Sequence, residues 1–146
     1  MSIPRAAHEA HVATRSTFFL ARYQAETYAL LRIITGFLFL WHGAQKLFGY
    51  PSPMPPGVPG FIIWLGGSIE FFGGVLVMLG FFTHWAAFVC CGMMAAAYWM
   101  AHGTKALLPF VNQGEPAVLY CFVFLFLSAR GSGIWSIDSA RGRSGR

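Results

Sequence analysis

The chain has 146 residues, of which 56% are hydrophobic and only 10% are charged, with a formal net charge of +5 at pH 7. An ordinary soluble domain carries about 25% charged residues, so this composition argues against a soluble protein and predicts a single-domain membrane protein. The basic residues lie mostly in the two tails without interleaved aromatic residues. This distribution argues against a nucleic-acid partner and suits anionic lipid headgroups.

Four apolar segments predict an all-α membrane protein, a four-transmembrane-helix bundle, because a membrane span needs about 20 mostly apolar residues. They are residues 28–48, 61–79, 85–101 and 116–129, the last extending upstream through Glu115. A proline-rich loop over 49–60 follows the first helix, and a tight turn at 80–84 makes the second and third an antiparallel hairpin. We therefore expect a tail over 1–27, a four-helix membrane domain over 28–131 and a basic tail over 132–146.

The distribution of arginine and lysine predicts the orientation of this bundle. Arginines flank the tail side of the membrane, whereas the loop over 102–115 has only Lys105 and the proline-rich loop has no basic residue. The arginines are Arg5, Arg15, Arg22, Arg130, Arg141, Arg143 and Arg146. Because basic residues stay on the cytoplasmic side, we expect both tails to be cytoplasmic (N-in/C-in) in a multi-pass protein of the bacterial plasma (inner) membrane.

The first helix carries polar and small residues on one arc of roughly 120°, at steps of three and four residues. This arc must face protein, because the rest of the helix is Leu, Ile and Phe and suits lipid. Its members are Arg32, Thr35, Gly36, Phe39, His42, Gly43 and Lys46.

The second helix places Glu70 near the membrane midplane, among small residues that let another helix backbone approach closely. These residues are Gly66, Gly67, Gly73 and Gly74, and Gly36 and Gly43 are small residues of the first helix. A buried carboxylate should be paired or protonated. At 1.5 Å per residue along the helix, the expected position of Arg32 is about 9 Å from the level of Glu70 on the tail side. That of His42 is about 6 Å from the same level on the other side. We prefer Arg32 as the partner because it is always charged, and the pair is either a structural lock or a proton site.

Polar residues at the outer helix ends predict a second polar layer near the outer face, which forms a water-accessible pocket. They are His42, Gln45, Lys46, Tyr98, His102, Asn112 and Glu115. Simpler interpretations are that Lys46 reaches the outer headgroups and that His102 caps a helix. Haem ligation by His42 and His102 is a weaker alternative, and no metal site is expected. The cysteines form no CxxC or zinc spacing and favour apolar packing, although Cys91 and Cys121 could pair.

Three motifs are specific beyond hydropathy: LRIITGFLFLWHGAQKLFG, WLGGSIEFFGGVLVMLGFFT, and NQGE followed by LYCFVFLFLSARGSGIWSID. Over residues 30–138 the chain resembles the DoxX family of small bacterial and archaeal membrane proteins. The resemblance implies a four-helix fold and a redox-linked membrane subunit, since some members are subunits of thiosulfate:quinone oxidoreductase. One departure is His84, where relatives often carry Arg.

The leading functional hypothesis is a membrane subunit of a quinone-linked oxidoreductase complex. A quinone headgroup needs hydrogen-bond donors and a proton route beside an apolar slot, which the layer of His42, Lys46, His102 and Glu115 would supply. The chain has no nucleotide fingerprint and no iron–sulfur cysteines, so electrons must come through a redox-protein partner or bound cofactor. The alternatives are a proton-coupled small-molecule carrier using Glu70 and a purely structural scaffold. A homo-oligomer is also compatible with the sequence, and no catalytic residue is assigned.

Overall fold

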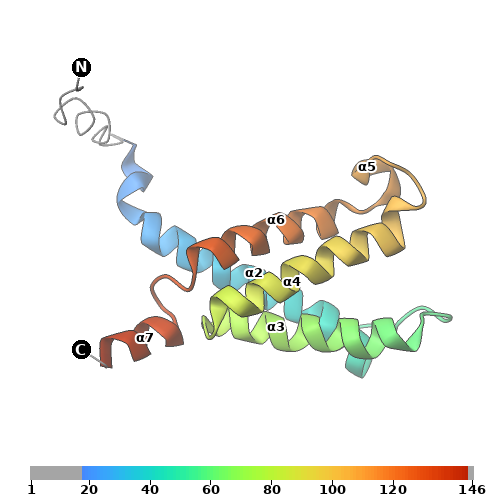
Figure 1. Cartoon of the computed structure of the whole chain (residues 1–146), viewed down its shortest axis with the longest axis horizontal. Helices are drawn as coiled ribbons and strands as arrows, with labels where there is room; N and C mark the ends of the chain where they lie inside the picture. Colours follow the sequence, from blue (N-terminus) through green and yellow to red (C-terminus); the bar gives the residue numbers. More distant parts are fainter. Residues whose placement is uncertain (1–17, 145–146) are drawn as a thin grey trace, which may run out of the picture.

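The computed structural model describes residues 18–144, and no strand occurs within that range. The main elements are four helical segments, and they lie side by side in the bundle (Figure 1). They are α2 (Gln24–Phe48), η2 with α3 (Ile62–Gly66 and Gly67–Leu79), α4 with η3 (Thr83–Ala97 and Tyr98–Gly103), and α6 (Glu115–Arg130). Three short elements complete the described chain: η1 (Phe19–Tyr23), α5 (Pro109–Asn112) and α7 (Ile137–Ser144). Arg5, Arg15 and Arg146, used above for orientation, lie outside the described residues.

The helices agree closely with the apolar runs, except at the two ends of the bundle. Helix α2 begins at Gln24 and is preceded by η1, so helical structure starts well inside the segment predicted as a tail. The first turn of α2 is polar but compatible with a helix, and it contains Glu26 at a position where a negative charge is favourable. At the other end, α7 follows a segment that contacts the bundle. Apolar content predicts which part of a helix lies in the membrane, but the helix itself can continue beyond that part.

Of the helices in residues 18–144, two are long and apolar enough to cross a membrane, Ile62–Leu79 and Thr83–Gly103. They form the predicted hairpin around Gly80, which ends α3 in the left-handed region with φ of 67°. Helix α6 has 16 residues, fewer than the about 20 of a typical span. The all-helical fold is thus confirmed, with two candidate spans.

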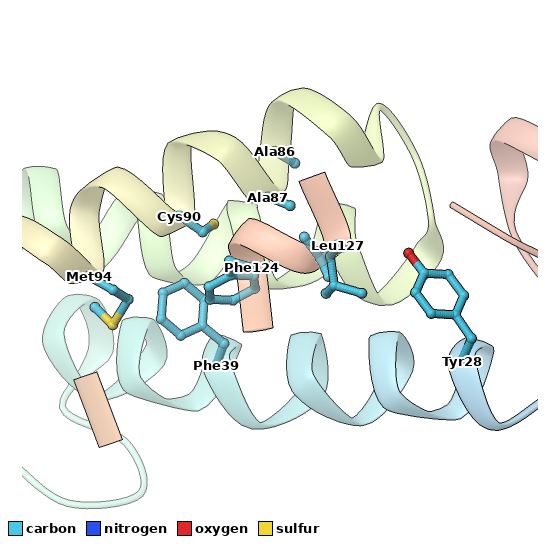
Figure 2. Packing of buried hydrophobic residues seen from close by; sticks show 9 residues of the cluster. Tyr28, Phe39, Ala86, Ala87, Cys90, Met94, Phe124 and Leu127 are labelled. Carbon is cyan, nitrogen blue, oxygen red and sulfur yellow. The ribbon is translucent and has the colours of Figure 1, made fainter. Parts of the chain in front are cut away.

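Two antiparallel helix pairs build the bundle, because α2 packs mainly on α3 and α4 mainly on α6. Aromatic side chains fill the space between α2 and α6. The rings of Phe39 and Phe124 are fully buried with centroids 4.6 Å apart, and Leu127 is buried beside them (Figure 2). Large apolar side chains such as Trp85 and Phe122 remain exposed on the outside. This inside-out distribution is what helices surrounded by lipid require.

The α2–α3 interface is a contact between backbones. Gly36 lies against Gly74. Seven residues later in α2, Gly43 lies against Gly67, which is seven residues earlier in α3. A Cβ added to Gly36 would lie 2.6 Å from the Gly74 carbonyl oxygen, and one added to Gly43 would lie 2.6 Å from that of Gly67. Only glycine permits this approach, since no side chain could occupy the interface.

The other two glycines of the GGSIEFFGG motif face α4. On the α4 side, a Cβ at Gly66 would meet the Met93 methyl group at 3.5 Å, and Gly73 lies against the sulfur of Cys90. The motif thus serves two neighbouring helices: one glycine of each pair packs on α2 and the other on α4.

The bundle has two ends. The turn end contains the α3–α4 turn at Gly80–Phe82 and the start of α2. The loop end contains the proline-rich loop over 49–60 and the loop over 104–114.

Candidate functional site

The most unusual feature of the bundle is a buried ion pair between α2 and α3. Lys46 Nζ lies 2.5 Å from Glu70 Oε2, and the two side chains are only 16% and 5% exposed. Glu70 occupies the middle of the Ile62–Leu79 span. Ionisable groups at such depth are expensive and commonly mark function. A short, charge-assisted hydrogen bond joins the two side chains, so neither buried charge is left without a partner.

The sequence predicts Arg32 as the partner of Glu70, and this prediction is wrong. The structure shows that the partner is Lys46. Helical side chains lean toward the N-terminus of their own helix. Lys46 is near the C-terminal end of α2, so its side chain leans back toward the middle of the bundle. Glu70 on the antiparallel helix leans toward the loop end and meets it. Arg32, like Lys46, leans toward the turn end, and this direction takes its side chain away from Glu70. A comparison of Cα depths alone therefore gave the wrong partner.

The rings of His42 and Tyr120 lie near the ion pair, between α2 and α6. His42 lies one turn before Lys46 and packs edge-on against Tyr120 of α6, with ring centroids 5.8 Å apart. Tyr120 continues to Phe39 at 5.2 Å. The pair therefore stands beside a wall that is mostly aromatic and carries two polar groups, the imidazole and the phenol.

A separate polar cluster at the loop end holds the connection between α4 and α6. The side-chain amide of buried Asn112 donates to the carbonyl of Ala106 at 2.8 Å and to the Tyr98 hydroxyl at 3.2 Å. Its oxygen accepts a hydrogen bond from the backbone N–H of Gly114 at 2.8 Å. The imidazole Nδ1 of His102 lies 2.9 Å from the Asn112 carbonyl oxygen. These contacts fold the loop back onto the end of the helix.

The predicted outer pocket is therefore divided. His42 and Lys46 lie beside Glu70, while Tyr98, His102 and Asn112 form the loop cluster. Gln45 donates to the hydroxyl of Ser52 at 3.0 Å in the proline-rich loop. Glu115 is exposed at the start of α6. No three His, Cys, Asp or Glu side chains in residues 18–144 are placed to hold a metal ion.

Arg32 lies at the turn end, where it closes the bundle. It is fully buried. Its Nη1 donates to the carbonyls of Val77 and Met78 at 2.8 and 2.7 Å, at the C-terminal end of α3. Its Nη2 donates to the carbonyls of Ile134 and Trp135 at 3.3 and 2.6 Å. A cation suits the free carbonyls of a helix C-terminus, so one guanidinium joins α2, α3 and the chain after α6.

Sequence reasoning missed the role of the segment that Arg32 holds, residues 131–138. The Tyr28 hydroxyl donates to the Gly131 carbonyl. The Asp138 carboxylate accepts from the backbone N–H groups of Phe82 and Thr83 at 3.0 and 3.1 Å and thereby caps the start of α4. An aspartate is a standard capping residue, but its distance in sequence from α4 concealed this role. Residues 131–138 are a strap over the turn end.

Known proteins resemble the chain over most of its length. The DoxX family model matches residues 27–103, more than half of the chain. An "Uncharacterized protein" of Haemophilus influenzae is 34% identical over 82% of this chain and 94% of its own length. "Inner membrane protein YqjF" of Escherichia coli is 30% identical over 73% of this chain and 85% of its own. "Putative oxidoreductase CatD" of Bacillus subtilis is 29% identical over 75% and 82%, respectively. No solved structure matches the chain. The chain belongs to the DoxX family of membrane proteins.

Proposed function

We propose that this protein is the integral membrane subunit of a quinone-linked redox complex, without self-contained catalytic machinery. The observation that carries the proposal is the buried Lys46–Glu70 pair beside His42 and Tyr120. Reduction of a quinone consumes two protons with its two electrons, and its carbonyl oxygens need hydrogen-bond donors. Lys46 is a donor, and Glu70 can accept and release a proton. A relative that bears the name "Putative oxidoreductase CatD" supports a redox assignment.

The proposal includes a topology of four spans, with both tails cytoplasmic in the bacterial plasma membrane. Two candidate spans form the α3–α4 hairpin, and α2 and α6 pack along them as long helices. Arg22, Arg130 and Arg141 all belong to the turn end, and basic residues favour the cytoplasmic side. The name of the relative "Inner membrane protein YqjF" supports the location.

Electrons would reach the quinone through a redox-protein partner, since the chain itself carries no recognisable nucleotide or iron–sulfur motif. The large apolar side chains on the outside of the bundle provide lipid contact and surface for such a partner or a second copy. The same ion pair also suits a proton-coupled small-molecule carrier, because carriers place their binding groups near the midplane. A purely structural scaffold would need the pair only for stability.

Quinone binding by the purified protein is the test. The protein is isolated in mild detergent, its lipids are extracted for quinone, and thermal unfolding is followed with and without a short-chain ubiquinone. A ligand at 100 times its Kd stabilises the folded state by about 2.7 kcal/mol, so a rise of several degrees is expected. Lys46→Gln should remove the rise, whereas Gln45→Ala, which loses only the exposed contact with Ser52, should retain it.

The competing functions predict different results from the same variants. A carrier would show proton uptake in proteoliposomes that Glu70→Gln abolishes without loss of folding. A scaffold would show neither quinone binding nor uptake, and Glu70→Gln would only lower the unfolding temperature. Absence of both extracted quinone and a thermal shift in the wild-type protein would refute the quinone proposal.

A further inference from the structure

The α4–α6 interface brings two cysteines together in a register that is held at both ends. Three residue pairs, spaced seven residues apart along α4 with η3 and along α6 with its N-cap residue Gly114, face each other across it. At the turn end His84 and Ser128 are joined twice: the imidazole Nδ1 lies 2.6 Å from the Ser128 carbonyl oxygen, and the Ser128 hydroxyl donates to the His84 carbonyl at 3.0 Å. At the loop end Gly114 lies directly against the ring of Tyr98.

The central pair of this register is Cys91 and Cys121. Their sulfur atoms are 3.7 Å apart, both side chains are half-buried, and both thiols are free. A disulfide needs a sulfur–sulfur distance of about 2.05 Å, so each sulfur must move by about 0.8 Å. Rotation about the side-chain bonds covers such a distance, and the contacts at both ends of the interface can stay in place.

Cys90 provides the contrast within the same helix. It is fully buried against Gly73 of α3, and its sulfur lies 4.0 Å from the Ile69 carbonyl oxygen. The next residue, Cys91, is rotated by about 100° on the helix and faces α6 instead. The interface with α6 therefore holds one thiol from each helix, and the interface with α3 holds a single thiol.

We propose that Cys91 and Cys121 are a redox-active dithiol that closes to an intramolecular disulfide, with a membrane quinone as the oxidant. The identity of the oxidant rests on the function proposed above. Two S–H bonds break and one S–S bond forms. The two electrons and two protons released convert the two carbonyl groups of one quinone into the hydroxyl groups of one quinol. The pair gives the chain a two-electron centre that its polar residues, which exchange only protons, do not provide.

Counting free thiols tests the proposal. The reduced full-length protein in lipid nanodiscs is treated anaerobically with diamide, a membrane-permeant thiol oxidant, or with a short-chain ubiquinone. It is then denatured and labelled with maleimide. Wild type should fall from three free thiols to one in both arms, with one quinol formed per disulfide in the second. Cys90→Ala should fall from two to none, whereas Cys91→Ser and Cys121→Ser should keep both. Mass spectrometry should find the 91–121 cross-linked peptide within one chain.

The outcomes separate this proposal from the proposed function. Three thiols remaining after diamide, or a cross-link through Cys90 or between two copies, would overturn the dithiol. A disulfide with diamide but none with quinone would overturn quinone as the oxidant. If quinone raises the unfolding temperature of wild type and Cys91→Ser equally while no disulfide forms, the dithiol fails and the quinone-linked function stands.

Discussion

Replacing Gly43 with alanine should separate α2 from α3. The new Cβ would lie closest to the backbone nitrogen of Phe71, 2.6 Å from the carbonyl oxygen of Gly67 and 2.7 Å from the Cα of Phe71, whereas ordinary contact begins at 3.4 Å. All three obstacles are backbone atoms, so rotation of a side chain cannot relieve them and the helices must move apart by more than about 0.8 Å. Overpacking costs typically about 1–3 kcal/mol, and backbone obstacles place this substitution at the upper end. Alanine regains about 1 kcal/mol of helix propensity, which leaves a net loss of about 2 kcal/mol.

The measurement is the unfolding midpoint of the purified protein in mild detergent, followed by tryptophan fluorescence during titration with SDS. Gly66→Ala is the matched control because Gly66 is the neighbour of Gly67 in the partner helix and its Cβ would meet only side-chain atoms, the Met93 methyl group at 3.5 Å and Ile62 Cγ2 at 4.0 Å. That variant should be neutral or more stable by up to about 1 kcal/mol. The backbone-contact interpretation of the α2–α3 interface fails if Gly43→Ala unfolds at the same SDS concentration as Gly66→Ala.

Three further predictions concern the strap and the topology. Arg32→Lys loses the planar fork that reaches two carbonyl pairs and should destabilise the protein by about 3 kcal/mol, with faster tryptic cleavage at Arg141; a wild-type cleavage rate would contradict this. Asp138→Ala removes the cap of α4 and should lower stability by about 1–2 kcal/mol in the SDS titration, and no change would show that the cap is dispensable. Cysteines placed singly at the exposed Ser52 and Ala140, in a background without native cysteines, should react oppositely with an impermeant thiol reagent in intact cells: Ser52→Cys labelled and Ala140→Cys protected. Labelling of both would mean an odd number of spans.

The sequence alone was sufficient to predict the four main helical segments and most of the face that α2 buries. Long apolar runs separated by proline and glycine predict helix positions directly, and the described helices begin and end within a few residues of them. The glycines on both sides of Glu70 indicated a face for close approach, because glycine in a helix has no local advantage and signals packing. The three motifs also led to the DoxX family.

Only the tertiary structure decided which polar groups meet. Depth along one helix cannot show that Lys46 and Glu70 lean toward each other while Arg32 leans away, since that depends on the antiparallel arrangement of α2 and α3. The pairing of Cys91 with Cys121 depends on the register of α4 against α6. The capping of α4 by Asp138 depends on the chain turning back across the bundle after α6. In each case the decisive quantity is the relative placement of two segments distant in sequence, which the local patterns of residues do not contain.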